Sequence, residues 1–505
     1  MKHQQLFWNA ATTMAQVIGS AGTLFVLYRF LIRTIGIERL GIWSLVLATT
    51  SVVTLANQGF STSVVRFVAK YAALGRPEKV CLLIETAILS IGGMLTIICV
   101  VLYPVAHWGL KLIVPLARFE EAATLLPFAF ATLWINVVGS VLLAGLAGYE
   151  LITYRNYVVF GGSVLYLLLA IAWVPQYGLL GLAYAQTANT AVCFVAAWGL
   201  LRHTIPQLPV IPRQWDRKLF REMCGYGVHF QFITLSQAVR EPVTKALLAK
   251  FGGLAMTGIY DIASRWVFTF RELIVQANLV LIPTISGLRE TNPDVIPRIY
   301  RESYRLVFFL AVPTFALLVV ISPVISNIWI GHYEPIFVSF VALLAMGWLV
   351  NIVSNPAYVV DLGTGALFWV SIGCAMTGVL NPALGYFAGR YWGGTAVVAA
   401  STVSLMAGYA VVLAAYHLEN KIPFRTIIPQ DSLGIVCASA VGVVVFLPYF
   451  CNENLRAMNS IRIVCSVAVA LLTIMIVPMS LHPLRRRLVN WVWSRLPACH
   501  WKIFA

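Results

Sequence analysis

Charged residues are scarce in this sequence of 505 residues. Asp, Glu, Lys and Arg together make up 11% of the chain, whereas about 25% is usual for a soluble domain. Hydrophobic residues make up 60%, and the mean hydropathy is +0.84. So few charges cannot cover a soluble body of this size. Long apolar runs such as residues 82–103 recur along the chain, and this pattern is typical of a polytopic α-helical membrane protein.

Acidic residues are scarcer than basic ones, at 19 against 35, which gives a net charge of +16. Such an excess could indicate nucleic-acid binding. The Lys and Arg residues, however, lie mostly in short loops between apolar runs, as expected when cytoplasmic loops retain positive charge. Their distribution favours both termini in the cytoplasm, and we expect no nucleic-acid partner.

The sequence also lacks the spacings of metal and disulfide sites. Its nine cysteines show no CxxC or Cys/His pattern and lie mostly within apolar runs, so we expect buried side chains, no metal site and no cofactor. The loops are short and carry no Asp/His cluster. These absences argue against a membrane enzyme such as a polysaccharide polymerase or a glycosyltransferase.

Apolar runs predict fourteen transmembrane helices, at residues 9–33, 38–60, 80–104, 124–147, 157–175, 179–201, 225–250, 254–287, 303–330, 335–360, 366–388, 393–416, 432–451 and 460–482. We divide the chain into an N-lobe with the first six helices (1–202), a Pro-rich and amphipathic linker (203–222), a C-lobe with helices seven to twelve (223–418), two further helices (419–484) and a basic interfacial tail (485–505). In the linker, Trp215, Leu219 and Met223 share one helical face, which predicts a helix lying at the membrane interface.

An internal repeat supports the two lobes. The pattern of a basic residue, two glycines and an aromatic residue occurs twice at an offset of 217: Arg33, Gly36, Gly41 and Trp43 match Lys250, Gly253, Gly258 and Tyr260. Residues 75–79 match 291–295 at an offset of 216, and 176–185 match 391–400 at 215. The offset spans six helices, so both copies keep one orientation. The repeat therefore predicts two pseudo-symmetric six-helix lobes, an arrangement typical of alternating-access transporters.

The segments KFGGLAMTGIYDIASRW (250–266) and YGLLGLAYA (177–185), with the number of helices, resemble the polysaccharide branch of the multidrug/oligosaccharidyl-lipid/polysaccharide (MOP) exporter superfamily. The resemblance covers essentially the whole chain. It implies a flippase with a central cavity between two lobes. It also implies a substrate of undecaprenyl pyrophosphate carrying an oligosaccharide, moved from the inner to the outer leaflet.

Charges inside predicted helix seven form one polar stripe. At 100° per residue, Gln237, Arg240, Glu241 and Lys245 fall on one side of the helix. Asp261, Arg265 and Glu272 share a side of helix eight, and Arg271 points away from it. A charge at the bilayer centre costs at least about 2.5–3.5 kcal/mol, so these residues are expected to pair, to face water or to bind substrate.

Two interpretations remain open for this stripe. In one, the charges only lock the two helices together, through pairs such as Arg240–Asp261 or Glu241–Arg265. In the other, they line the cavity and bind pyrophosphate, which arginine recognises with a planar fork of donors. The predicted substrate-binding residues are Arg240, Lys245, Arg265, Arg271, Gln237, Gln16 and Arg29, and the predicted ion-coupling or charge-pair residues are Glu241, Asp261 and Glu272.

The first predicted helix has an uncharged stripe at helical spacing, formed by Asn9, Thr13, Gln16, Ser20 and Thr23. These side chains could bind sugar hydroxyls or could hold helices together. Arg29 lies on the opposite side of a straight helix and would extend to the outer interface, unless a bend at Gly19 or Gly22 turns it inward.

These observations predict an alternating-access flippase for a lipid-linked oligosaccharide, such as an O-antigen, capsule or exopolysaccharide unit, in the bacterial inner membrane. The alternatives are a peptidoglycan lipid-precursor flippase and a multidrug or cation antiporter of the same superfamily. A cation antiporter would need an anionic cavity, and the first helix has no acidic residue. The expected partners are the lipid-linked substrate, membrane lipids and a polysaccharide polymerase with its chain-length machinery. We expect a monomer.

Overall fold

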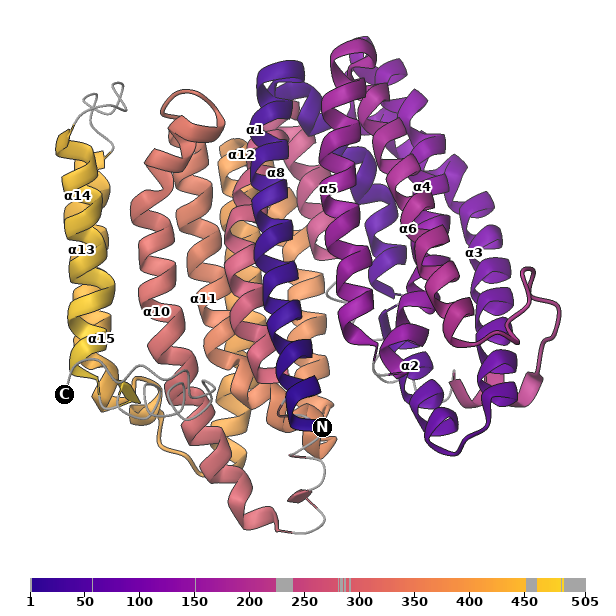
Figure 1. The fold of residues 1–505 in the computed structure, drawn as a ribbon. Helices are drawn as coiled ribbons and strands as arrows, with labels where there is room; N and C mark the ends of the chain where they lie inside the picture. Colours follow the sequence, from indigo (N-terminus) through magenta and orange to yellow (C-terminus); the bar gives the residue numbers. More distant parts are fainter. Residues whose placement is uncertain are drawn as a thin grey trace, which may run out of the picture. The chain divides into compact units, whose positions relative to one another are not determined.

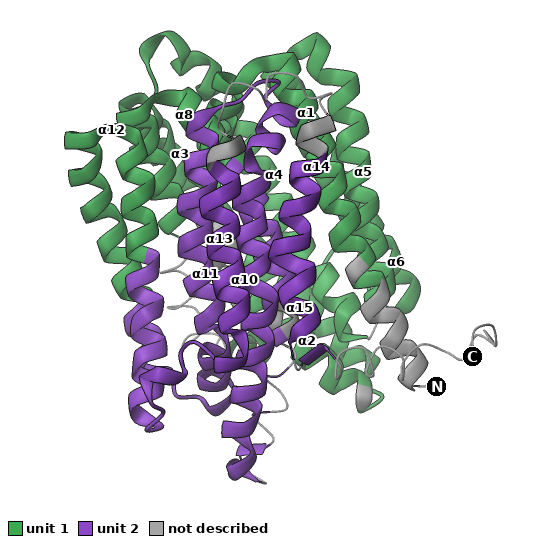
Figure 2. Cartoon of the chain, turned by 90° about the vertical axis from the view of Figure 1, so that its left-hand side faces the viewer, with its two compact units in different colours: residues 1–262, 374–404 green, residues 263–373, 405–505 purple. Residues whose placement is uncertain are grey.

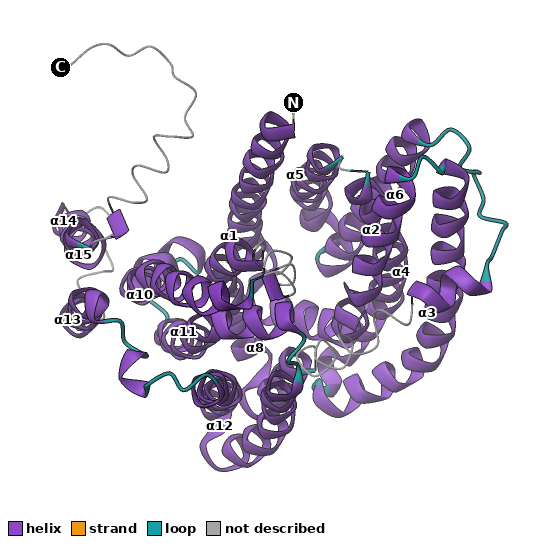
Figure 3. Ribbon diagram, turned by 90° about the horizontal axis from the view of Figure 1, so that it is seen from below, coloured by secondary structure: helices purple, strands orange, loops and turns teal. Residues whose placement is uncertain are grey.

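The computed structural model describes residues 2–56, 58–149, 151–223, 239–279, 292–450 and 461–482, with isolated positions between 281 and 289 and at 484–485. These residues form helices joined by short connections, and none of them lies in a strand (Figures 1 and 3). The predicted all-α class is therefore confirmed. The predicted basic tail lies outside the described residues, except for Arg485.

The chain divides into two compact units (Figure 2). Unit 1 comprises residues 1–262 and 374–404, and unit 2 comprises 263–373 and 405–505. Unit 1 contains α1 (Lys2–Ala56), α2 (Gln58–Ala73), α3 (Pro77–Ile113), α4 (Leu116–Gly148), α5 (Ile152–Tyr177), α6 (Leu179–Thr204), the start of α8 (Arg240–Leu279) and the middle of α12 (Phe368–Glu419). The unit boundaries cut through α8 and α12, so the lobes inferred from the repeat remain a prediction.

Unit 2 contains the rest of α8 and α12 together with the remaining helical elements. These are η1 (Pro293–Val295), α10 (Ile296–Trp329), α11 (Pro335–Thr364), η2 (Phe424–Thr426), η3 (Gln430–Ser432), α13 (Leu433–Phe450), α14 (Ile461–Leu471), η5 (Leu472–Ile476) and α15 (Val477–Leu481). Helix α10 packs against α11 and α13. Its residues Tyr300, Tyr304 and Phe308 recur every fourth position and are buried in the core of the unit, as expected for the inner face of a helix.

Ten of the described helical segments are long and apolar enough to cross a membrane, and Cys465–Leu481 is a shorter apolar helix. Three of the ten lie in helices with a non-helical glycine: Gly36 in α1, Gly253 in α8 and Gly393 in α12. Each of these helices holds two of the predicted crossings. Counting these three twice gives thirteen crossings, and Cys465–Leu481 would supply one more, so the described helices are compatible with the predicted fourteen.

Hydrogen bonds show that α1 folds back at Gly36. Tyr28 and Ser44 lie eight residues before and eight after this glycine, and both donate to the carboxylate of Asp261, at 2.6 and 2.8 Å. In a straight helix their Cα atoms would be separated by about 24 Å. Likewise Lys245 and Asp261 lie eight residues before and after Gly253, and their side chains meet at 2.7 Å. Both helices are therefore hairpins with a glycine at the turn.

The two turn glycines adopt the same backbone conformation, with φ/ψ of 82°/165° at Gly36 and 85°/172° at Gly253. This region is essentially restricted to glycine. The other repeat matches also hold, since Gly178 and Gly393 both have positive φ. Pro77 and Pro293 both begin helical segments. The sequence repeat thus corresponds to a repeat of local structure.

The second glycine of each copy lies where the two hairpins touch. A Cβ atom on Gly41 would lie 1.9 Å from the carbonyl oxygen of Leu254, and one on Gly258 would lie 2.4 Å from that of Ile37. Leu254 is the repeat equivalent of Ile37 at the offset of 217. The contact is therefore reciprocal, as expected at a pseudo-two-fold axis.

The linker after α6 is attached to α3 by a buried carboxylate. Oε2 of Glu85 accepts hydrogen bonds from the backbone amides of Arg213 and Gln214, at 2.7 and 3.0 Å. Residues 217–223 are helical, and Leu219 and Met223 are buried in the core formed with α2, α3, α4 and α6. Leu219 and Met223 therefore pack against protein, and the position of this helix at the membrane interface stays a prediction.

We expect a Glu85→Leu variant to release the linker, because two amide groups lose a charged acceptor and each such bond contributes about 1.5–3 kcal/mol. Trypsin should then cut at Arg213 several-fold faster than in the wild type. A Glu78→Leu variant, changed at an exposed position in the first turn of α3, serves as the control. Equal cleavage of all three proteins would show that Glu85 does not hold the linker.

Candidate functional site

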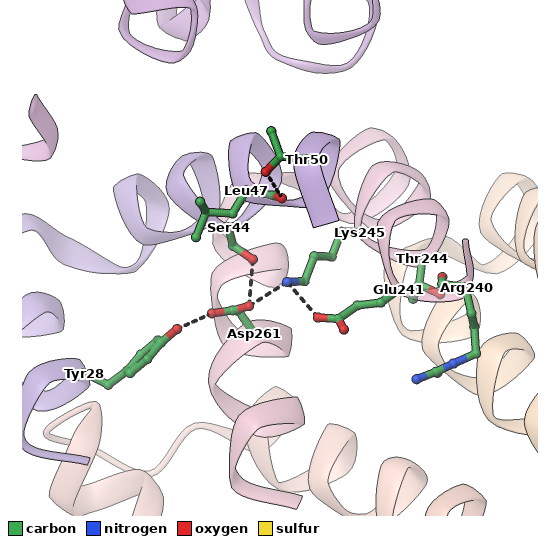
Figure 4. A network of polar contacts seen from close by, with 9 residues as sticks. All are labelled: Tyr28, Ser44, Leu47, Thr50, Arg240, Glu241, Thr244, Lys245 and Asp261. Carbon is green, nitrogen blue, oxygen red and sulfur yellow. Dashed lines mark hydrogen bonds and ion pairs between the residues drawn. The ribbon is translucent and has the colours of Figure 1, made fainter. Parts of the chain in front are cut away.

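The most buried charge in unit 1 is the carboxylate of Asp261, which is 1% exposed. Three donors surround it (Figure 4): the hydroxyl of Tyr28, the hydroxyl of Ser44 and the ammonium group of Lys245. Ser44 and Lys245 both donate to Oδ1, and Tyr28 donates to Oδ2. These bonds offset the cost of removing a carboxylate from water.

Lys245 bridges two carboxylates. Its Nζ atom lies 2.7 Å from Asp261 and 2.9 Å from Oε1 of Glu241. The side chain of Lys245 is buried, whereas that of Glu241 is 47% exposed. The Asp261 contact is therefore buried on both sides, whereas the Glu241 contact involves a half-exposed carboxylate.

This network combines equivalent positions of the two repeats. At the offset of 217, Tyr28 corresponds to Lys245 and Ser44 corresponds to Asp261. The first repeat thus contributes a neutral pair and the second a charged pair. All four side chains meet where the α1 and α8 hairpins touch, so the network ties the two hairpins together.

Arg240 is the first residue of α8, about one turn before Lys245, and is 9% exposed. Its Nη1 atom donates to the hydroxyl of Ser401 at 3.2 Å, and its carbonyl oxygen accepts from the amide of Asn381 at 3.0 Å. Thr244 bonds both Asn381 and Ser401. Neutral side chains of α8 and α12, namely Thr244, Asn381 and Ser401, thus lie beside Arg240 in unit 1.

In unit 2, Arg271 contacts several groups at once. Its Nε atom donates to Asn351 at 3.0 Å, and its Nη1 atom pairs with Glu272. Its guanidinium carbon lies 5.3 Å from the ring centre of Phe268 and 4.9 Å from that of Trp348. A guanidinium held by stacking, an amide and a carboxylate is a fixed structural element, yet it retains further donors.

The other predicted residues are placed as follows. Arg265 is half-buried on the part of α8 that belongs to unit 2, and Arg29 is exposed. Gln16 donates to Ser20 at 3.3 Å. Gln237 lies outside the described residues. In the structure, Lys245 contacts both Glu241 and Asp261. The cation paired with Asp261 is therefore Lys245. The suggested pairs Arg240–Asp261 and Glu241–Arg265 stay predictions.

For two members of the α1 stripe, the structure favours the helix-packing alternative. The amide of Asn156 on α5 donates to Thr13 at 2.9 Å, and the hydroxyl of Ser163 donates to Ser20 at 3.0 Å. Interhelical bonds of this kind hold helices together within a membrane.

Sequence reasoning missed Tyr28, Ser44, Asn381 and Ser401. The first two could have been found by applying the offset of 217 to Lys245 and Asp261. Nothing in the pattern singled out Asn381 and Ser401, because a lone amide or hydroxyl on a membrane helix is common. Among the described residues, no group of three or more His, Cys, Asp or Glu side chains could hold a metal ion.

Comparisons with known proteins place this geometry in context. Residues 30–333 match the model of a family described as polysaccharide biosynthesis protein. No curated protein matches the sequence.

Solved structures share the fold. An inward-facing multidrug resistance MATE family transporter of the MOP superfamily aligns with a TM-score of 0.71 at 15% identity, over 80% of this chain and 96% of that one. The lipid II flippase MurJ, in an inward closed conformation, aligns with a TM-score of 0.71 at 12% identity, over 95% and 99%. A MOP superfamily transporter from Pyrococcus furiosus, described as having a binding pocket of reverse polarity, aligns at 0.60 and 14%, over 82% and 95%.

Proposed function

Because this chain belongs to the polysaccharide biosynthesis protein family and has the fold of MOP superfamily transporters, we propose that it is a flippase for an undecaprenyl-pyrophosphate-linked oligosaccharide. It carries an O-antigen, capsule or exopolysaccharide unit across the bacterial inner membrane by alternating access. Its termini are cytoplasmic, and it works as a monomer beside a polysaccharide polymerase and its chain-length machinery.

The observation that carries this proposal is the buried guanidinium of Arg240 on a membrane helix, which donates to the hydroxyl of Ser401 on α12. A guanidinium presents several N–H donors in a planar fork, a geometry that matches the oxygens of an anion. Pyrophosphate offers several acceptor oxygens to such a fork. Arg265, on the part of α8 in unit 2, is a predicted substrate-binding residue that is tested in the same way.

Lys245 binds the substrate by exchanging one of its two carboxylate partners for the pyrophosphate. Asp261 keeps the ammonium group in place when no substrate is bound, and Glu241 satisfies its second side. The substrate pyrophosphate replaces Glu241, whose side chain is half-exposed, and leaves the Asp261 bond intact. The lysine therefore never lacks a partner during the cycle, and Glu241 becomes available to take up a coupling proton or sodium ion.

A cation antiporter fits these residues less well. Such a protein needs a free carboxylate for a cationic drug, whereas Asp261 accepts three hydrogen bonds and Glu241 pairs with Lys245. Buried basic side chains would also repel the drug.

A second candidate is a flippase for the peptidoglycan lipid precursor. The lipid II flippase aligns over 95% of this chain, against 80% for the multidrug transporter, so its similarity extends over almost the whole sequence. The two candidates are separated by the lipid that accumulates when the protein is removed: a lipid-linked glycan for the first, or lipid II for the second.

To test the proposal, we would delete the gene and complement the strain with Arg240→Ala and with Arg265→Ala. Each variant should export at least tenfold less glycan than the wild type, because pyrophosphate loses a charge-assisted donor worth about 1.5–3 kcal/mol. Lipid-linked glycan should accumulate in the inner leaflet, as measured by mass spectrometry of extracted lipids. Arg298→Ala, changed at an exposed site on α10, is the control. Full complementation by both test variants would refute the assignment.

A further inference from the structure

Unit 1 encloses a cavity of about 340 Å³ between α1, α4, α5 and α6. Ligand pockets usually measure about 300–1,000 Å³, so this one suits a small group, such as one sugar ring, and is too small for a whole oligosaccharide. The side chains that line it include hydrophobic and neutral polar groups, and no residue of its lining is charged.

Two asparagines in the lining have unused hydrogen-bonding groups. Within the described residues, Asn136 of α4 makes no hydrogen bond, and its side chain is exposed. Asn189 of α6 accepts a weak bond from the thiol of Cys193 at 3.7 Å, while its NH₂ group donates to no described residue. Both asparagines lie on helices that can cross the membrane. An amide left unpaired in hydrocarbon is costly, so this pair is expected to face water or a ligand.

The remaining polar groups of the lining extend the same chemistry. Tyr166 donates its hydroxyl to Gln186 at 3.2 Å, and a phenolic oxygen is also a hydrogen-bond acceptor. The hydroxyls of Thr190 and Thr23 donate to backbone carbonyls and keep their acceptor sites as well. Donors and acceptors thus surround an otherwise apolar space. A sugar ring, with hydroxyl edges and C–H faces, has the complementary pattern.

The wall of the cavity is shaped at Gly162 on α5. A Cβ atom there would lie 2.4 Å from the sulfur of Cys193 and 3.5 Å from Oδ1 of Asn189. The glycine therefore leaves the room that the side chain of Cys193 occupies at the edge of the cavity, while Asn189 would be in ordinary van der Waals contact. On the preceding residue, Gly161, a Cβ atom would meet nothing within 4 Å.

We propose that this cavity binds one uncharged sugar of the translocated glycan, with Asn136 and Asn189 as the residues that recognise its hydroxyl or acetamido groups. This inference rests on the proposed function, and adds to it a sugar subsite separate from the pyrophosphate residues of α8. Because the lining has no basic residue, the subsite selects a neutral sugar over an acidic one.

Cys193 reports directly on occupancy of the cavity. We would alkylate the reconstituted protein with N-ethylmaleimide and measure modification of each cysteine by mass spectrometry. The two probes are undecaprenyl pyrophosphate and the lipid-linked glycan extracted from a strain that lacks this protein. We expect the glycolipid to slow alkylation of Cys193 at least fivefold, while undecaprenyl pyrophosphate has no effect. Cys437, exposed on α13 in unit 2, is the internal control.

The outcomes separate this inference from the proposed function. If the glycolipid raises the unfolding temperature but Cys193 reacts as before, or if undecaprenyl pyrophosphate protects it equally, the sugar subsite is refuted and the flippase proposal stands. If neither lipid binds, the proposed function fails, and this inference fails with it.

Paired variants test the recognising residues. Asn136→Leu and Asn189→Leu remove amides that make no described hydrogen bond to another helix, so both proteins should fold. Their affinity for the glycolipid should nevertheless fall at least tenfold. Affinity for undecaprenyl pyrophosphate should not change. Tyr166→Phe should weaken glycolipid binding, whereas Tyr157→Phe, on the same helix but outside the lining, should not. Wild-type affinity for the glycolipid in both asparagine variants would overturn the assignment.

Discussion

An Asp261→Leu variant is expected to unfold with a free energy about 3–5 kcal/mol below that of the wild type. The substitution leaves the buried ammonium group of Lys245 without its closest carboxylate. It also removes the acceptor of the Tyr28 and Ser44 hydroxyls. Glu241 remains beside Lys245, but it is half-exposed and cannot replace a buried partner. Thermal unfolding in detergent micelles measures the loss.

The double variant Lys245→Met/Asp261→Leu separates stability from transport. It removes both charges, and apolar replacement of a whole buried pair is often neutral or stabilising. We therefore expect most of the lost stability to return. If Lys245 also binds pyrophosphate, the double variant should still fail to export glycan. Wild-type stability of the single Asp261→Leu variant would contradict the role of this carboxylate in joining the hairpins.

A Gly41→Ala variant is expected to lose about 3 kcal/mol of stability or more, at the upper end of what overpacking costs. The new Cβ atom would lie 1.9 Å from the carbonyl oxygen of Leu254, so the α1 and α8 hairpins must separate. Unfolding temperature and the yield of folded protein both report this loss.

Gly22→Ala is the matched control for this substitution. It lies on the same helix, and its Cβ atom would meet nothing within 4 Å. Alanine favours a helix over glycine by about 1 kcal/mol, so this variant should be as stable as the wild type or more stable. The two substitutions are chemically identical and are expected to shift stability in opposite directions. A gain of stability in both would show that the hairpins do not touch at Gly41.

The sequence was sufficient to predict the class of protein, the repeat and the residues of the charged stripe, because each leaves a periodic signal in an apolar background. The sequence was less informative about which of these charges contact each other. The sequence suggested Arg240 as a partner of Asp261 and did not suggest Lys245, which contacts that carboxylate; Lys245 and Asp261 lie at equal distances from the turn at Gly253. In a hairpin, the position of the turn determines which residues face each other.

Other features left no signal in the pattern. The carboxylate of Glu85 binds backbone amides of the linker, and such groups are present in every residue. The cavity in unit 1 depends on how α1, α4, α5 and α6 pack together around Asn136 and Asn189. Long-range contacts of this kind need the fold itself.

The meeting of Tyr28, Ser44, Lys245 and Asp261 also bears on how this protein diverged from an ancestor with two identical halves. In such an ancestor, the positions now held by the charged pair would have matched Tyr28 and Ser44. A lysine introduced first would have met only hydroxyl groups at a buried site, whereas an aspartate introduced first would have found two hydroxyl donors already aimed at its carboxylate. The least costly order of mutations therefore places Asp261 before Lys245. A buried aspartate in turn favours a cation beside it, and Lys245 holds that position in the present protein.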